Sequence, residues 1–210
     1  MSDNPTLADL TSKQGWVRNS CDLTKWIPCP AKFLDGFDRD SWAAAMAEGW
    51  WEQNGLEYRQ VAIDKLAFML RELHQQGYEN VPCHQIWAYY RDLAVPPLPL
   101  HIGIWAMTGE RDQQLRSLSG AADPDAVRPP VVTEFATGPL GAGFRTLRHV
   151  KYRHRKVCGM LGFAFRSVEF ETDVQVLTGT PDLRQLQKAT GDIEDFVRGM
   201  SVYYNPAPRP

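Results

Sequence analysis

The chain has 210 residues, of which 43% are hydrophobic and 23% are charged, and its formal net charge is -2 at pH 7. These values are ordinary for a folded chain that is long enough to bury one sizeable core. A net charge so close to zero gives no general attraction to polyanions. The charge therefore gives no reason to expect nucleic acid or an anionic membrane as the main partner, and both stay possible but less favoured than another protein.

The cysteines and the first residues indicate a reducing compartment. Cys21, Cys29, Cys83 and Cys158 are scattered, and because none stands in a C-x-x-C pair, neither a zinc ribbon nor a redox motif is indicated. The start MSDNPTLADL lacks the basic and apolar regions of a signal peptide. No apolar run approaches the roughly 18 residues of a membrane-spanning helix. We expect a soluble, cytoplasmic protein with no transmembrane segment and four free thiols.

The N-terminal part is expected to be irregular. We assign residues 1–37 to an irregular segment, 38–204 to a single domain and 205–210 to a loose, proline-rich tail. Within the first segment, residues 25–30 can form a short edge strand, because proline removes a ladder donor and is tolerated at a sheet edge.

Two helices are predicted next. The first follows a capping Asp38 or Asp40 and continues to about Gln53, and the second covers residues 59–75, with Gly77 at the left-handed cap. In the first helix an apolar stripe of side chains stands at a spacing of four, namely Trp42, Met46 and Trp50.

Trp51 is adjacent to Trp50, so only one of the two can face the core squarely. Trp51 is expected toward the flank or the outside of the helix. An exposed tryptophan is a good anchor at a protein interface, and it can equally cover the sheet edge under the N-terminal segment.

Strand-like runs then follow one another, and the clearest is 98–107, where aliphatic residues occupy alternate positions. The others are rich in β-branched and aromatic residues and cover 81–90, 131–137, 143–151, 157–170 and 172–178. A closing helix is predicted with Thr180 as its cap and Met200 near its end, and Gly191 is expected to bend or break it.

Two helices, a run of strands and a final helix give an α+β order, because alternating βαβ units are missing. Strands joined by short turns are antiparallel neighbours. We therefore predict a single antiparallel sheet of five to seven strands, with the N-terminal helices and the C-terminal helix packed on it.

The end of the chain resembles a known family. The strand with Asp173-Val174-Gln175-Val176, followed by Thr180-Pro181-Asp182 and a helix, is similar to the C-terminal end of the Mog1/PsbP-like α/β/α sandwich. The resemblance covers about half of the chain and includes no diagnostic motif. Because most members of that family are binding modules, it implies a partner protein more than a reaction, and it assigns no functional residue.

No catalytic signature stands out. Cys83 and His84 are a nucleophile next to a base, but neighbours on a strand point to opposite faces and cannot bond each other. The five histidines have neither the helical nor the strand spacing of a metal site. We assign no catalytic residue, no cofactor and no metal.

A basic run at 148–156 is the strongest local anomaly. Its permanent charges are those of Arg148, Lys151, Arg153, Arg155 and Lys156. They could hold phosphates or anionic lipid. Alternatively, they are solvated charges at a hairpin tip, where they discourage edge-to-edge aggregation.

The sequence favours a non-enzymatic domain that acts through contact with another protein. The partner would use the Trp-bearing first helix or the loop at 109–130. One alternative is an enzyme, of unassigned reaction, with a pocket on the sheet face of His101 and Trp105. The other is an anion-binding module that uses the hairpin at 148–156.

Overall fold

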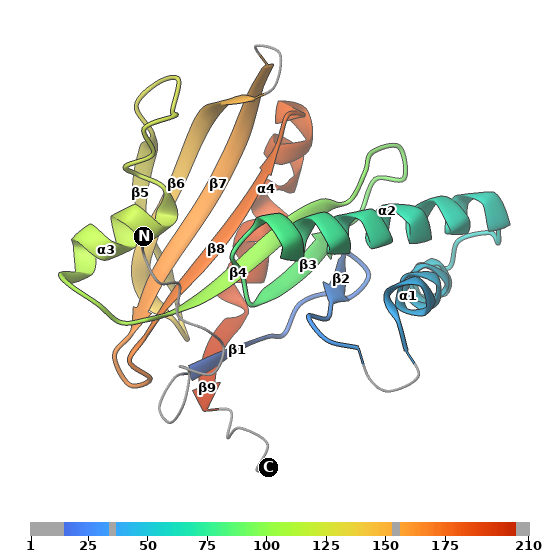
Figure 1. The fold of residues 1–210 in the computed structure, drawn as a ribbon, viewed down its shortest axis with the longest axis horizontal. Helices are drawn as coiled ribbons and strands as arrows, with labels where there is room; N and C mark the ends of the chain where they lie inside the picture. The colour runs from blue at the N-terminus through green and yellow to red at the C-terminus, as the bar shows by residue number, and fades with distance from the viewer. Residues whose placement is uncertain (1–14, 34–36, 153–155, 205–210) are drawn as a thin grey trace.

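The structure is a computed structural model, and it describes residues 15–33, 37–152 and 156–204. A seven-stranded sheet has the order β2-β3-β4-β8-β7-β6-β5, with every neighbouring pair antiparallel, and a two-stranded sheet pairs β1 with β9 (Figure 1). The strands are β1 Gly15–Asn19, β2 Trp26–Cys29, β3 Gln85–Tyr89, β4 Leu98–Ala106, β5 Val131–Thr137, β6 Gly141–Tyr152, β7 Lys156–Ser167, β8 Thr172–Thr180 and β9 Met200–Tyr204.

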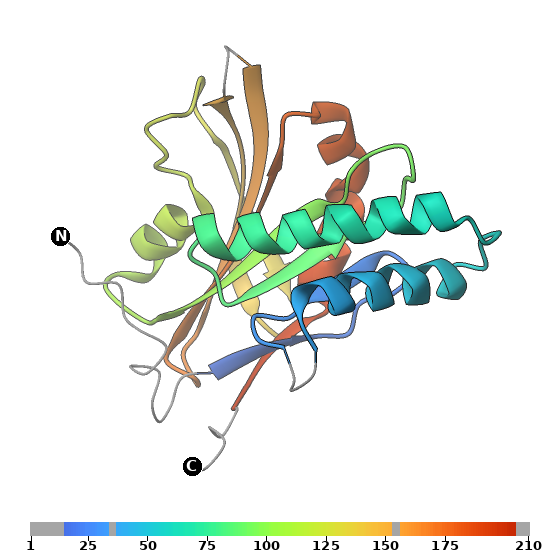
Figure 2. The same ribbon diagram turned by 45° about the vertical axis from the view of Figure 1, so that its right-hand side comes forward.

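Helices cover both faces of the large sheet, which confirms the predicted α+β fold. They are α1 Arg39–Gln53, α2 Gln60–Asn80, α3 Arg111–Ser119 and α4 Leu183–Arg198. Figures 1 and 2 show α2 and α3 in front of the sheet, α1 alongside α2, and α4 behind the sheet. The sheet therefore has a different core on each of its faces.

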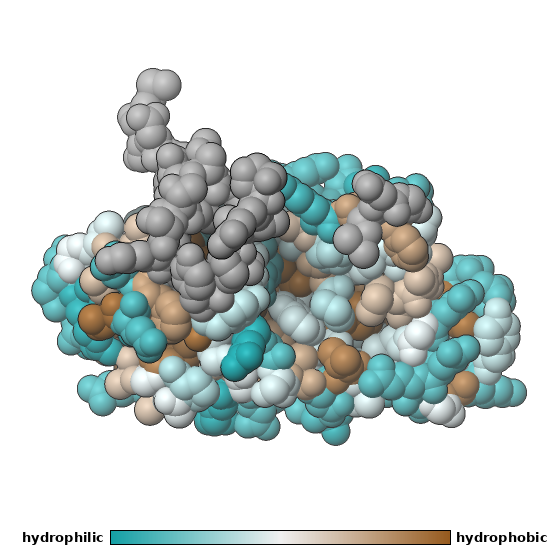
Figure 3. Space-filling model, turned by 90° about the horizontal axis from the view of Figure 1, so that it is seen from below, coloured by the Kyte–Doolittle hydropathy of each residue, from teal (hydrophilic) through white to brown (hydrophobic). Residues whose placement is uncertain are grey.

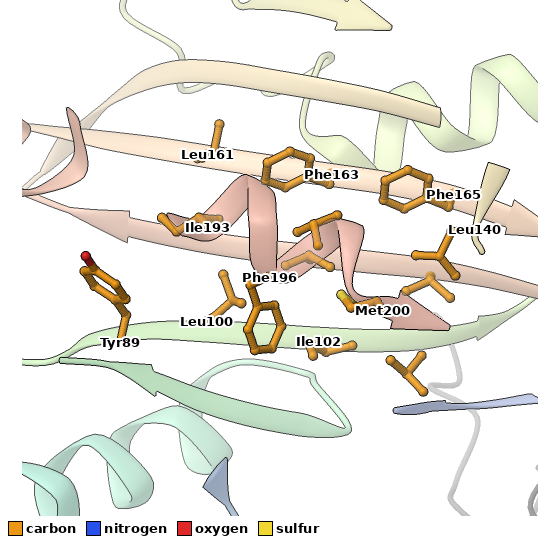
Figure 4. Packing of buried hydrophobic residues seen from close by; sticks show 14 of the residues in the cluster. Tyr89, Leu100, Ile102, Leu140, Leu161, Phe163, Phe165, Ile193, Phe196 and Met200 are labelled. Atoms are coloured by element: carbon orange, nitrogen blue, oxygen red, sulfur yellow. The ribbon is translucent and has the colours of Figure 1, made fainter. Parts of the chain in front are cut away.

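The core on the α4 face follows the alternation of β4. Leu100 and Ile102 point to this face, and the register places Val176 of β8 between Ile102 and Phe163 of β7. Phe196 of α4 packs against these side chains of the sheet, as Figure 4 shows. Because strand alternation and helix periodicity both place apolar side chains here, the sequence predicted this core correctly.

The core on the opposite face lies between α1, α2 and the strands β2 and β3. Gly77 sits in the interior of α2, where a Cβ would lie 2.5 Å from Cδ1 of Ile86. The predicted end of the helix at Gly77 was therefore wrong, because this glycine allows α2 to approach β3 closely. The buried residues of this core are Ile27, Cys29, Trp42, Ala43, Ala47, Trp50, Trp51, Ile63, Leu66, Leu70, Ile86, Ala88 and Tyr90.

Helix α3 lies within the expected long connection at 109–130 and packs over β6 and β7. Glu110 caps it by accepting the amides of Asp112 and Gln113, and its Leu115 is fully buried. A Cβ on Gly162 of β7 would collide with the carbonyl oxygen of Ser119, so glycine permits this close approach. Part of the loop proposed as a partner site is thus packed on the sheet.

The chain ends differ from the sequence prediction. The edge strand expected at residues 25–30 is present as β2, but the rest of the segment expected to be irregular also contributes β1, which pairs with β9 and was not predicted (Figure 1). Helix α4 ends at Arg198 and runs through Gly191 without interruption, and its cap is Asp182 in place of Thr180. The tail at 205–210 lies outside the described residues.

Candidate functional site

Three hollows in the surface meet at the loop 90–97 between β3 and β4. The largest, with a volume of about 790 Å³, lies between this loop and the start of α4 and is named the α4 groove. The α2 groove, of about 570 Å³, lies between α2 and the prolines of the loop. A third hollow, of about 420 Å³, separates Leu93 from the start of α2. Figures 1 and 2 show the loop rising between α2 and α4.

A carboxylate on α4 holds the beginning of this loop. Asp192 accepts hydrogen bonds from Nζ of Lys25 at 2.9 Å, from the hydroxyl of Tyr89 at 2.6 Å and from Nη1 of Arg91 at 3.0 Å. Lys25 precedes β2, Tyr89 ends β3 and Arg91 begins the loop. One largely buried carboxylate therefore connects α4 to two segments that lie far from it in the sequence, one at Lys25 and one at Tyr89 and Arg91.

These contacts fix the protonation states of the cluster. Burial alone would raise the pKa of Asp192, but the hydrogen bonds from Lys25, Tyr89 and Arg91 lower it below its ordinary value. Burial, followed by the bond to Asp192, raises the pKa of Tyr89 to about 12. At neutral pH the aspartate is ionised and the phenol is protonated, and each has its partners within the protein. The cluster has the properties of a structural clamp.

The rim of the α4 groove carries cations that are not engaged. Arg184 and Lys188 stand one turn apart on α4, and both side chains are exposed. Within the part of the chain that the structure describes, neither has an ion-pair partner within 4.0 Å. Both are available to an anionic group that enters the groove.

The two acidic residues of the same rim bond to the amides of their own turns. Asp182 accepts the backbone amides of Arg184 at 3.0 Å and Gln185 at 3.1 Å, as a helix cap does. Asp92 accepts the amide of Ala94 at 3.0 Å. Each carboxylate already has donors, so their demand for an external cation is reduced.

Exposed apolar side chains surround the loop. Leu93, which lines both the α4 groove and the third hollow, is 44% exposed, and Phe68, which lines the α2 groove, is 53% exposed. By contrast, the face seen from below shows hydrophobic residues in separate places among hydrophilic ones (Figure 3). Apolar side chains gathered beside hollows and charges are typical of interaction surfaces.

The pocket that was expected on the His101 and Trp105 face holds only one of these residues. His101 lines the α2 groove, and its Nδ1 is buried and has no hydrogen-bond partner among the residues that the structure describes. Burial lowers the pKa of His101 to about 4. Trp105 is not among the residues that line this groove. It packs edge-on against His84 and donates its indole N–H to Gln175 at 3.2 Å.

Trp51 is not the exposed anchor that the sequence suggested. Trp50 is 4% exposed and Trp51 is 5% exposed, and the indole N–H of Trp51 donates to the carbonyl oxygen of Glu57 at 2.9 Å. The prediction assumed a helix covered on one side only. Helix α1 is covered by α2 as well as by the strands, so adjacent residues on it can both be buried.

The residues of the basic run at 148–156 differ in how far they are buried. Arg148 is 7% exposed and pairs with Asp123, so it is not available to an external anion, and its assignment to an anion site was wrong. Lys151 is exposed. Arg153 and Arg155 lie outside the described residues, as does the side chain of Lys156.

The thiols are not activated. Burial raises the pKa of Cys21 and of Cys83 to about 11, and it raises the pKa of Cys29 and Cys158 as well. Cys83 packs in the core of α1 and α2, whereas its neighbour His84 accepts the amide of Ile104 at Nδ1, at 3.0 Å. A thiol that stays protonated is a poor nucleophile.

Neither a metal-binding group of side chains nor a membrane-spanning helix is found in the described residues. No three His, Cys, Asp or Glu side chains within the described ranges gather as a metal site would require. No helix in those ranges is both long enough and apolar enough to cross a bilayer. Comparison with models of protein families found no match, and comparison with curated proteins found none.

Sequence reasoning missed the loop 90–97 as the place where hollows meet. A local signal was present, because Leu93 stands among charged and small residues just before two prolines, and a leucine in such a turn has little chance of burial. The pairing of Asp192 with Lys25 and Arg91 had no signal, since these residues are far apart in the chain.

Proposed function

We propose that this chain is a non-enzymatic module that binds another protein. The binding surface is the loop 90–97 with the rims of its hollows, named the loop surface, and its main residues are Leu93, Phe68, Arg184 and Lys188. The observation that carries the proposal is the meeting of three hollows at one loop with exposed apolar side chains beside them. Interfaces combine an apolar centre with a charged rim in this way.

The chemistry of the described side chains supports binding more than catalysis. Next to the α4 groove, the hydroxyl of Tyr89 is bonded to Asp192 and its pKa is raised to about 12, so this phenol is not poised to transfer a proton at neutral pH. The thiols have raised pKa values. An enzyme that uses the α2 groove is the alternative, and the unpartnered Nδ1 of His101 supports it. However, an imidazole with a pKa of about 4 is a weak base at neutral pH.

A cytoplasmic location is part of the same proposal. The four cysteines are free thiols in the structure, and no two of them form a disulfide. Free thiols persist in a reducing compartment, which supports a partner that is itself cytoplasmic.

Site-specific photo-crosslinking in the native cell tests the proposal. A photoreactive amino acid at position 93 should capture a defined protein, because Leu93 lies at the centre of the loop surface. The matched control is position 168 in the turn between β7 and β8, where Val168 is 71% exposed and lies outside the loop surface. After purification, the captured protein should bind the parent chain, and its affinity for a Leu93→Asp variant should be lower than its affinity for the parent chain. Equal capture at both positions, or none at 93, would contradict the proposal.

A further inference from the structure

We infer that the α4 groove binds a peptide segment that is both acidic and apolar, supplied by the partner protein, an inference that rests on the proposed function. The groove offers one wall of cations from α4 and one wall of apolar side chains from the loop 90–97. A segment that alternates carboxylates with aliphatic residues would complement both walls.

The charge of the groove favours an acidic ligand. Its lining holds three cations, Arg91, Arg184 and Lys188, and two anions, Asp92 and Asp182. Among these three cations, only Arg91 has a carboxylate partner within the described residues, and that partner is Asp192 at 3.0 Å. Both rim carboxylates accept backbone amides of their own turns. The charges left for a ligand are positive.

The hydroxyl of Tyr89 next to the groove already has a hydrogen-bond partner, which favours a peptide over a small polar ligand. A small polar ligand is usually oriented by a few converging polar groups that wait unpaired in the pocket. Here the hydroxyl of Tyr89 is already bonded to Asp192, and burial and that bond raise its pKa to about 12. Recognition is left to the exposed rim, where a longer, flexible chain can reach Arg184 and Lys188 together.

The apolar wall of the groove favours a ligand that also carries apolar side chains. Leu93 is 44% exposed, and Val95 and Pro96 continue the wall beside it. Contact with these side chains would remove apolar surface from water, so that a purely acidic ligand would forgo this part of the binding free energy. The volume of about 790 Å³ lies within the range of clefts that enclose small ligands, which corresponds to a few residues of a peptide.

The groove is held open before any ligand arrives. The side-chain amide of Gln185 donates to the carbonyl oxygen of Pro96 at 2.7 Å, which ties the end of the loop to α4. Asp192 ties the beginning of the loop through Arg91. Because both ends are fixed, little ordering of the loop is needed on binding, and preorganisation favours affinity.

Binding of labelled peptides to the purified full-length chain tests the inference. The probe is a pool of short peptides of Glu, Asp and Leu in random order, and its matched pool carries Gln and Asn in place of the acids. We expect fluorescence anisotropy to show binding of the acidic pool alone, and binding that weakens as salt rises. The double variant Arg184→Glu/Lys188→Glu should weaken it by about tenfold or more, as expected when two close charge pairs are lost.

The control variant makes the same charge change elsewhere. Lys32 and Lys151 are both exposed, and Lys32→Glu/Lys151→Glu should leave the affinity within about twofold, since distant surface charges are screened. Inorganic phosphate at matched charge concentration should not displace the peptides. Absence of binding, equal loss in both double variants, or loss only in the Lys32 and Lys151 variant would overturn the inference.

The proposed function can survive that failure. If position 93 captures a partner while the acidic pool does not bind, the loop surface is used but the α4 groove does not take an acidic segment. If the acidic pool binds and position 93 captures nothing, the groove recognises such segments but the protein partnership is contradicted.

Discussion

Arg148 and Asp123 form a largely buried ion pair, in which Nε of the arginine lies 2.8 Å from Oδ2 of the aspartate. The pair connects β6 to the segment that follows α3. Nη1 of Arg148 also donates to the carbonyl oxygen of Ser119 at 3.1 Å, at the end of α3. A basic run that looks like a solvated hairpin tip in sequence therefore begins with a residue that holds a helix on the sheet.

Replacing Asp123 by alanine should destabilise the protein. The guanidinium of Arg148 would stay buried without its carboxylate, and such a loss should lower the free energy of unfolding by about 2 to 3 kcal/mol. Urea denaturation of both proteins measures the difference. Asp125→Ala, at an exposed position two residues away, serves as the control and should change stability by less than about 0.5 kcal/mol. Equal midpoints for parent and Asp123→Ala would contradict the role given to this pair.

The sequence predicted the large sheet well because its signal is local. The alternation in β4 and the closing helix α4 were each predicted from one stretch of chain, and the structure packs both into the same core. The pairing of β1 with β9 joins residues that are about 185 positions apart, such as Trp16 and Tyr203, and no local pattern reveals such a pair.

The candidate site was predicted less well for the same reason. Trp51 was placed by helix geometry alone, but the burial of α1 by α2 is a tertiary fact. Similarly, Asp192 looks like an ordinary surface residue of an amphipathic helix. Only the fold brings Lys25, Tyr89 and Arg91 to it.

Two glycines should respond in opposite ways to replacement by alanine. Gly191 lies exposed inside α4 with open space around it, so Gly191→Ala should raise the free energy of unfolding by about 0.5 to 1 kcal/mol. Gly162→Ala would push a methyl group into the carbonyl of Ser119, and should lower it by about 1 to 3 kcal/mol. Thermal unfolding of both variants beside the parent tests the pair. Equal effects of the same sign would argue against the close contact of α3 with β7.

Truncation of the central phenylalanine should be costly. Phe163 is fully buried and packs edge-on against Phe135, with the two ring centroids 5.0 Å apart. Phe163→Ala should lower the free energy of unfolding by about 3 to 5 kcal/mol, because a cavity is added to the loss of apolar burial. Val131→Ala, at a half-exposed position in β5, should cost less than about 1 kcal/mol. A Phe163→Ala variant that unfolds like the parent would mean that β7 has another register.

The thiols should react slowly in the folded protein. Because burial raises the pKa of Cys21 and Cys83 to about 11, very little thiolate is present near neutral pH. A thiol reagent should label the native protein far more slowly than free cysteine, and should then find all four thiols after denaturation without reductant. One thiol that reacts faster than free cysteine in the native state would indicate activation, and would favour an enzyme over a binding module.

Acid should destabilise the protein through His101. The pKa of this imidazole is about 4 when folded, against an ordinary value of 6.5, because burial disfavours the charged ring. Since the folded pKa is the lower one, the unfolded chain binds the proton first as pH falls. The contribution of the neutral imidazole to the free energy of unfolding is fully present above about pH 6.5. It declines between about pH 6.5 and pH 4 and is lost below about pH 4, and its size is about 3 kcal/mol.

In a His101→Gln variant this contribution is missing, so the free energy of unfolding should fall less steeply between these pH values. His74 and His84, whose pKa values burial also lowers, stay in the variant and keep some slope. Denaturation with urea across this pH range measures both slopes, and identical slopes would show that His101 is protonated as easily in the folded protein as in the unfolded chain.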